Sequence, residues 1–198
     1  MSGAPGSELV VRPVTAERWP DLEALFGKNG AHGGCWCMFW RLRRADYQAM
    51  TGEGRRDRLR GLALAGEEPG VLATLAGQPV GWCAVGPRED FLALENSRIL
   101  KRVHAQPVWS IACFFVSKTQ RRRGITRALL AGAVAFAAAR GASLIEGYPI
   151  DLQSPPLAGQ KLTSVGGYMG IASVYRQLGF VEVGRASETQ LIMRLDIS

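Results

Sequence analysis

A chain of 198 residues with 47% hydrophobic and 21% charged residues has the composition of a folded globular protein, which excludes an intrinsically disordered one. Its net charge of +7 predicts attraction to an anionic ligand, whether a nucleic acid, an anionic lipid or a polyphosphate cofactor. The four cysteines have neither the paired spacing of a zinc site nor the density of a disulfide scaffold, so we expect free thiols in the cytosol.

The start of the chain and its most apolar run bear on targeting. Residues 1–8 are rich in Gly, Ser, Pro and Ala, so we expect a flexible tail there and a single domain over residues 9–198. The tail has no basic region followed by an apolar stretch, which predicts no secretory signal. The apolar run at 128–139 is shorter than the roughly 20 residues that a spanning helix needs. We therefore expect a cytoplasmic protein with no membrane association.

The first half of the chain alternates between strand and helix patterns. Thr15 is a candidate helix N-cap, Gly27 a candidate helix end, and Pro20 fits only the first turn of that helix. In order, the patterns predict a strand at 9–14, a helix at 15–27, an ordered loop at 30–40, a helical region at 44–65 broken near Gly52 and Gly54, and a hairpin with strands at 71–75 and 80–85.

The second half begins with a charged connection at 88–104 and then an almost wholly apolar segment. That segment, residues 108–116, has the pattern of a central strand covered on both faces. The patterns that follow predict a helix at 124–140, a strand at 144–150, a loop at 153–170, a helix at 171–179, and strands at 180–184 and 190–195. This order indicates one mixed α/β sheet rather than two domains.

The turn at 116–126 lies between the apolar strand and the alanine-rich helix. A turn that leads into a helix presents unpaired N–H groups and the positive end of the helix dipole, which together form an anion site. Gly124 allows close approach of a phosphate, and Arg121, Arg122 and Arg123 add positive charge. The turn therefore suits a pyrophosphate, although an ordinary helix start with solvated arginines is the alternative.

Two motifs in order resemble the GNAT N-acetyltransferase superfamily. Its acyl-CoA loop has the form Arg or Gln, two variable residues, Gly, one variable residue, then Gly or Ala, and here Arg121, Gly124 and Thr126 stand at those positions. Thr126 departs from the usual small residue but offers a hydroxyl donor. The second motif, Tyr, three variable residues, then Gly and Phe at a helix end, is similar to residues 175–180. The motifs cover residues 108–185, and the order of elements extends the resemblance to most of the chain.

The resemblance implies a mixed, mostly antiparallel sheet flanked by helices, in which two parallel strands, here 108–116 and 144–150, splay apart. The pantetheine arm of acetyl-CoA would lie in the gap and pair with the backbone of Phe114, Phe115 and Val116. The residues implied to hold the phosphates are those of the loop, namely Arg121, Arg122, Arg123, Gly124, Ile125 and Thr126. No metal is implied.

Acyl transfer needs a deprotonated amine and a proton for the departing thiolate. The resemblance implies Tyr175 as the general acid, with an aromatic packing role as the alternative. The base is open, because residues 108–116 contain no carboxylate. Glu146 is the first candidate for the general base, and Asp151 and His104 are the others. For each of the three, a structural role is the alternative.

The segment at 34–40 is unusually rich in aromatic residues and cysteine for a loop. Trp36, Phe39 and Trp40, together with Trp82, are candidates for the wall of the acceptor pocket, and a small satellite core is the alternative. With residues 148–151, the segment resembles a largely uncharacterised branch of the superfamily. A zinc site is not expected there, because His32 stands at an odd spacing from Cys35 and Cys37.

These observations predict an N-acyltransferase that moves an acetyl or other short acyl group from coenzyme A to a primary amine. The acceptor is a small molecule in the first hypothesis and a protein or peptide in the second. The third hypothesis is a module without catalysis that binds CoA or nucleic acid. Nucleic acid is disfavoured, because the basic turn at 118–123 lacks interleaved aromatic residues. A homodimer is left open.

Overall fold

The computed structural model describes residues 8–159 and 167–198, and seven strands among them form one sheet. The order across the sheet is β1-β2-β3-β4-β5-β7-β6, and β4 and β5 are parallel while the other neighbours are antiparallel. The strands are β1 (Leu9–Pro13), β2 (Gly70–Leu75), β3 (Gln78–Pro87), β4 (Trp109–Val116), β5 (Leu144–Gly147), β6 (Val181–Arg185) and β7 (Leu191–Asp196). The mixed, mostly antiparallel sheet with one parallel pair is thus confirmed. The expected tail, apart from Glu8, lies outside the described residues.

The helices follow the sequence signals closely in the first half of the chain. They are α1 (Trp19–Phe26), α2 (Arg44–Ala49), α3 (Gly52–Leu64), α4 (Leu92–Glu95), α5 (Ile125–Ala138) and α6 (Ala172–Arg176). Pro20 lies in the first turn of α1, as its missing N–H requires. The helical region at 44–65 divides just before Gly52, where the Thr51 side chain accepts a hydrogen bond from the Gly54 N–H at 3.1 Å and begins α3.

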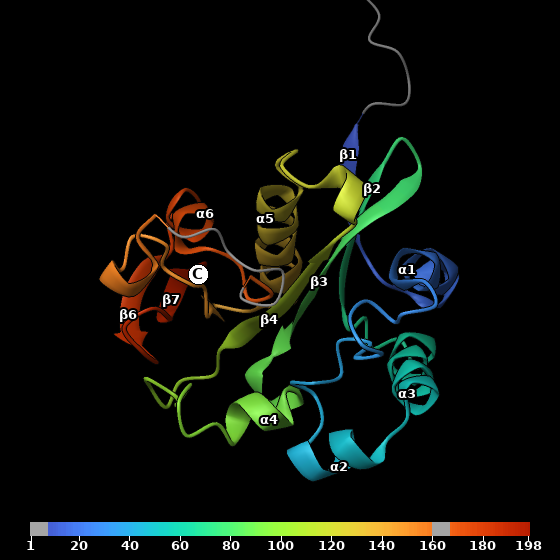
Figure 1. The fold of residues 1–198 in the computed structure, drawn as a ribbon, viewed down its shortest axis with the longest axis horizontal. Coiled ribbons are helices and arrows are strands. Elements are labelled where there is room, and N and C mark those ends of the chain that lie inside the picture. The colour runs from blue at the N-terminus through green and yellow to red at the C-terminus, as the bar shows by residue number, and fades with distance from the viewer. Residues whose placement is uncertain (1–7, 160–166) are drawn as a thin grey trace, which may run out of the picture.

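Both faces of the sheet are buried, and the strand residues alternate between them. Leu72, Trp82 and Ala112 pack toward α1 and α3, whereas Cys83 and Ile111 pack toward α5 and α6. Figure 1 shows α5 and α6 on one side of the central strands and α1 and α3 on the other. This explains why β3 and β4 read as nearly continuous apolar runs.

Helix α5 lies very close to the sheet because a glycine stands at each of two contacts, one on the helix and one on a strand. A Cβ on Gly132 of α5 would stand 2.4 Å from Val11 of β1, and a Cβ on Gly81 of β3 would stand 2.8 Å from Ile125. Glycine at these two positions allows the backbones to approach. The first turn of α5 therefore packs directly on β3.

The second half differs from expectation in three places. The connection at 88–104 contains a 3₁₀ turn, Arg88–Asp90, and α4, because a buried arginine organises it. Strand β5 ends at Gly147 rather than at residue 150, and α6 is shorter than the expected 171–179. Of the loop expected at 153–170, residues 160–166 lie outside the described part of the chain. Among the described residues, none of the helices combines the length and the apolar character needed to cross a membrane.

Candidate functional site

The parallel strands β4 and β5 separate soon after they meet. They pair over three residue pairs, from Trp109–Ile145 to Ile111–Gly147, and β4 then continues to Val116 with β3 on one edge and without β5 on the other. Beyond the pairing, the Phe114 N–H donates to the Tyr168 carbonyl at 2.6 Å. The splayed pair is thus present, and the segment at 167–170 lies along the part of β4 that β5 has left.

A basic cleft lies at the end of β4 and has a volume of about 990 Å³. Its lining includes the positive side chains of Lys28, Lys118 and Arg121 and the hydroxyl residues Ser117 and Thr126. None of the described residues that line it is Asp or Glu. The cleft therefore suits an anion with several charges.

The turn before α5 has the backbone geometry of an anion-binding turn. Gly124 is the N-cap of α5 with φ +76°, a left-handed conformation that glycine adopts without strain. No heavy atom outside its neighbours lies within 4 Å of the position a Cβ would take, so the turn is open at this point. Because α5 is 14 residues long, its N-terminal N–H groups and dipole add positive potential there.

The residues expected to bind the cofactor divide into two groups. Phe114, Phe115 and Val116 line the basic cleft together with Arg121 and Thr126. The others lie in the same turn but outside the lining: Arg122, Arg123 and Gly124 are exposed, and Ile125 is buried in the core under α5. The Arg123 guanidinium donates to the Gln120 side chain at 2.6 Å.

A second hollow, which we call the aromatic cavity, has a volume of about 580 Å³ and adjoins the basic cleft. The two share residues of the loop at 31–33, of β4 and of the 167–170 segment, namely Ala31, His32, Gly33, Phe114, Phe115 and Tyr168. Its remaining lining is mostly apolar and aromatic: Cys35, Cys37, Phe39, Trp40, Tyr47, Cys113, Ile150, Met169 and Gln190. The loop at 31–40 thus forms a wall between a basic and an apolar space.

Of the four aromatic residues expected in an acceptor pocket, two line this cavity. Phe39 and Trp40 do so, with Phe39 contacting Trp40 edge-on at a centroid distance of 4.9 Å. Trp36 instead stacks on Trp19 at 6.0 Å, and Trp82 is fully buried in the sheet. The satellite-core alternative therefore describes Trp36 and Trp82.

Three thiols gather at the wall of the aromatic cavity. The Cys37 Sγ donates to the Cys113 Sγ at 3.7 Å, and Cys35 lines the cavity beside them. Contact with Cys37 and burial raise the pKa of Cys35, and contact with Cys113 and burial raise that of Cys37. These two cysteines are thus neutral thiols at physiological pH. Among the described residues, no group of three or more His, Cys, Asp or Glu side chains could hold a metal ion.

Tyr175 of α6 is fully buried where β5 ends. Its hydroxyl donates to the Met169 carbonyl at 3.1 Å. A Cβ on Gly147 would stand 2.5 Å from the Tyr175 hydroxyl oxygen. Burial raises the pKa of Tyr175 well above its ordinary value, so the phenol keeps its proton at neutral pH. Tyr175 lies at the point where the parallel strands separate, but the segment at 167–170 covers it, and it is not in the lining of the cleft or the cavity.

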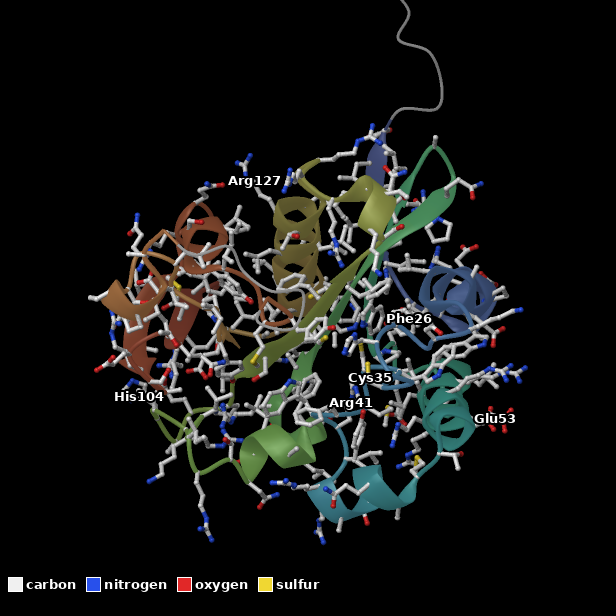
Figure 2. The ribbon with its side chains drawn as sticks, in the orientation of Figure 1. Phe26, Cys35, Arg41, Glu53, His104 and Arg127 are labelled. Carbon is white, nitrogen blue, oxygen red and sulfur yellow. The ribbon has the colours of Figure 1, made fainter. Side chains whose placement is uncertain are left out.

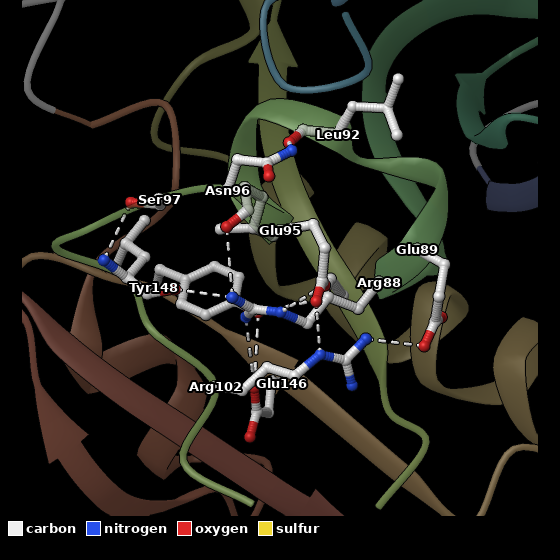
Figure 3. A network of polar contacts seen from close by, with 12 residues as sticks. Arg88, Glu89, Leu92, Glu95, Asn96, Ser97, Arg102, Glu146 and Tyr148 are labelled. Carbon is white, nitrogen blue, oxygen red and sulfur yellow. Dashed lines mark hydrogen bonds and ion pairs between the residues drawn. The ribbon is translucent and has the colours of Figure 1, made fainter. Parts of the chain in front are cut away.

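Glu146 is a buried member of an ion-pair network. Arg194 donates to it through Nε at 3.0 Å, and the Arg88 Nη1 lies 3.8 Å away. Tyr148 donates to the other carboxylate oxygen at 3.4 Å. Figure 3 shows Glu146 beneath the Arg88 guanidinium, within this network. Glu146 is not among the residues that line either hollow. Its carboxylate is thus committed to structure in this conformation.

The other two base candidates also lie outside both hollows. The Asp151 carboxylate accepts a hydrogen bond from Arg176 at 2.9 Å, and this bond lowers its pKa. His104 is exposed in the connection before β4 and lies well apart from Cys35 of the cavity wall (Figure 2). Asp151 ties α6 to the chain after β5, so its role in this conformation is structural.

Sequence reasoning missed His32 and Tyr168 as site residues. His32 is exposed, lines both hollows, and its ring lies 5.5 Å from that of Tyr168. One signal was available, since His32 is one of only two histidines and stands just before the cysteine and tryptophan segment. Tyr168 carried no signal, because its place beside β4 depends on a tertiary hydrogen bond.

A sequence model described as the acetyltransferase (GNAT) family matches residues 36–149, so the chain belongs to this family. Among solved structures, an N-acetyltransferase from Staphylococcus aureus Mu50 is similar over 97% of this chain and 100% of its own, with a TM-score of 0.54 and 13% identity. A ribosomal-protein-alanine N-acetyltransferase from Brucella melitensis has a TM-score of 0.52 and 20% identity over 95% of this chain and 99% of its own.

The structure of yncA from Salmonella typhimurium with its cofactor acetyl-CoA has a TM-score of 0.53 and 14% identity over 96% of this chain and 94% of its own. At these identities the structural comparisons establish the shared fold. No curated protein sequence matches the chain significantly. Membership of an acetyltransferase family supports acyl transfer from coenzyme A as the general activity.

Proposed function

We propose that this protein transfers an acetyl group from acetyl-CoA to the primary amine of a small molecule, within one domain over residues 9–198. The observation that carries the proposal is that the basic cleft and the aromatic cavity meet beside the free part of β4. An anionic donor in the cleft and an apolar acceptor in the cavity would bring their reacting ends together near Phe114, Tyr168 and His32.

The residues of the basic cleft fit coenzyme A. Lys28, Lys118 and Arg121 would neutralise phosphate charge, and the open N-terminus of α5 at Gly124 would accept the diphosphate. The exposed Arg122 and Arg123 are close enough in the chain to add to the same field. When bound, acetyl-CoA supplies a thioester whose C–S bond breaks as the amine nitrogen bonds to the acetyl carbon.

Backbone pairing with the pantetheine arm requires that a hydrogen bond within the protein be exchanged for one to the cofactor. The Phe114 N–H faces the gap and is held by the Tyr168 carbonyl, while residues 114–116 pair with residues 81–83 of β3 on the other edge of the strand. We propose that the segment at 167–170 yields the Phe114 N–H to the cofactor when it binds. That same shift would uncover the Tyr175 hydroxyl, because Met169 is its present hydrogen-bond partner.

His32 is our proposed proton acceptor, because its imidazole lines both hollows at their junction. We expect His32→Ala to lower kcat/KM by about 100-fold, the low end for a positioned base. His32 is exposed, so the melting temperature should change little. The measurement is steady-state kinetics with and without added imidazole, which should restore part of the rate. A variant with wild-type turnover would remove His32 from the mechanism.

Tyr175 is our proposed proton donor to the departing thiolate, since its protonated hydroxyl lies where β4 and β5 separate. We expect Tyr175→Phe to lower kcat by about 100-fold and to leave the dissociation constant of CoA unchanged, because the phenyl ring keeps the packing against Phe114 and Phe180. Single-turnover kinetics and CoA titration separate the two effects. Unchanged turnover would leave Tyr175 as a packing residue.

The experiment that tests the proposed function combines binding with turnover. Acetyl-CoA should raise the melting temperature of the protein in a concentration-dependent manner, because a ligand that binds the native state alone stabilises it. Adding a primary amine should then release CoA and yield the N-acetylated amine, which mass spectrometry identifies. Absence of a thermal shift at millimolar acetyl-CoA would overturn the proposal.

A further inference from the structure

The wall of the aromatic cavity has the character of a small-molecule site. Its volume of about 580 Å³ lies in the range of ligand pockets. Phe39 contacts both Trp40 and Tyr47 edge-on, with ring centroids 4.9 and 5.4 Å apart, so three aromatic rings form a rigid cluster. Phe39 is nevertheless 51% exposed, although a large apolar ring is normally covered. The cluster therefore offers an open aromatic surface to a ligand.

Among the residues that the structure describes, the lining of the cavity offers no anion to a positively charged amine. None of the described residues in its lining is Asp, Glu, Lys or Arg, and the Cys35 and Cys37 thiols remain protonated because their pKa values are raised. A charge just behind the wall is positive, since the Arg55 guanidinium lies 4.0 Å from the centre of the Tyr47 ring. An alkylammonium group would thus lose its hydration without gaining a counter-ion, which is costly.

The polar groups of the lining suit an uncharged amino group. The Gln190 amide nitrogen donates to the Tyr148 carbonyl at 3.1 Å and lies 3.3 Å from the Met169 sulfur, which leaves the amide oxygen as an acceptor for an N–H donor. His32 lies at the mouth toward the basic cleft and can take up the proton that the nitrogen loses. A neutral acceptor and a base match an NH₂ group better than an NH₃⁺ group.

We propose that the acceptor is a primary aromatic amine, with its ring among Phe39, Trp40 and Tyr47 and its amino group uncharged before binding. This inference rests on the proposed function and names its substrate class. The nitrogen lone pair of an aromatic amine is delocalised into the ring, so the amine is neutral at physiological pH. In the transfer, the nitrogen forms the bond to the acetyl carbon, the C–S bond breaks, one nitrogen proton passes to His32, and the thiolate receives a proton from Tyr175.

The competing occupant is an alkylammonium group held by the faces of the aromatic rings. Such cation–π contacts are common in aromatic cages. Here the Tyr47 face already carries the Arg55 guanidinium. A second cation would be repelled at this position.

The test compares two isomeric amines, 4-methylaniline and benzylamine, which have the same atoms but differ in charge at neutral pH. We expect kcat/KM for 4-methylaniline to exceed that for benzylamine by about 10-fold or more, which corresponds to about 1.4 kcal/mol. Calorimetric titration of each amine into the protein saturated with CoA should show the same order of affinity. An equal or better benzylamine overturns the inference, and so does failure of 4-methylaniline to bind or react. Because acetyl-CoA binding is measured separately by the thermal shift, neither result is confused with failure of the proposed function.

A matched pair of variants tests the charge argument directly. Phe39→Asp places a carboxylate at the cavity, and Phe39→Asn is its uncharged control of the same size. In Phe39→Asp, the ratio of kcat/KM for 4-methylaniline over benzylamine should fall by about 10-fold relative to Phe39→Asn, because the ammonium gains a partner. The exposure of Phe39 allows both variants to fold, which thermal melting checks. Identical ratios in the two variants would contradict the inference.

Discussion

Replacing Gly124 with aspartate is expected to weaken binding of coenzyme A by about 100-fold or more, equivalent to about 2.7 kcal/mol. The carboxylate would stand at the N-terminus of α5, where the diphosphate is proposed to lie, and like charges would repel each other. The turn itself has room for the side chain, since no heavy atom lies within 4 Å of the Cβ position. The positive φ of Gly124 strains any other residue, but aspartate and asparagine adopt it more readily than most and share the same strain here.

Gly124→Asn is the matched control for this prediction, because asparagine has the same shape as aspartate without the charge and tolerates a positive φ. We expect the fold loss of CoA affinity in the asparagine variant to be at most about a tenth of that in the aspartate variant, because bulk alone obstructs little in an open turn. Calorimetric titration of CoA at low and high salt measures both variants, and the aspartate penalty should shrink as salt screens the charges. Wild-type affinity in Gly124→Asp would place the phosphates elsewhere.

The elements that the sequence predicted well are those whose signals are local. The anion-binding turn at 116–126 has its glycine, its arginines and the start of an alanine-rich helix within a few residues. The central strand β4 is recognisable because both of its faces are buried, which makes the whole segment apolar. The break before α3 was visible for a similar reason, since two glycines lie together at 52 and 54.

The remaining differences arise from contacts between distant segments. Strand β5 was expected to reach residue 150, but Ile150 leaves β4 to form bridges with Ile171 and Gln190 instead. Trp36 and Phe39 are both aromatic residues of the segment at 34–40, and the sequence does not distinguish their roles. Trp36 nevertheless packs on Trp19, while Phe39 stays exposed at the cavity. Side-chain type alone does not determine which of two neighbouring aromatic residues faces a ligand.

The connection at 88–104 is the clearest example of an ordered segment whose structure its charged sequence did not predict. It read as a charged linker, but the Arg88 side chain is completely buried and binds five partners (Figure 3). Its guanidinium donates to the Leu100 carbonyl at 2.6 Å and to the Tyr148 hydroxyl at 2.7 Å. The other partners are the Leu94 carbonyl at 3.2 Å and the carboxylates of Glu95 at 3.1 Å and Glu146 at 3.8 Å. One residue thus fixes α4, the loop at 96–100 and the C-terminal end of β5.

We expect Arg88→Met to lower the free energy of unfolding by about 3–5 kcal/mol, because removal of one partner leaves other buried groups uncompensated. Methionine fills the space of the side-chain stem, so the loss reflects the polar contacts more than a cavity. The control is Arg102→Met, which breaks ion pairs with Glu89 and Glu95 near the surface and should cost at most about 1 kcal/mol. Urea denaturation at neutral pH measures all three proteins. An Arg88→Met variant no less stable than Arg102→Met would show that the buried network does not hold the connection in place.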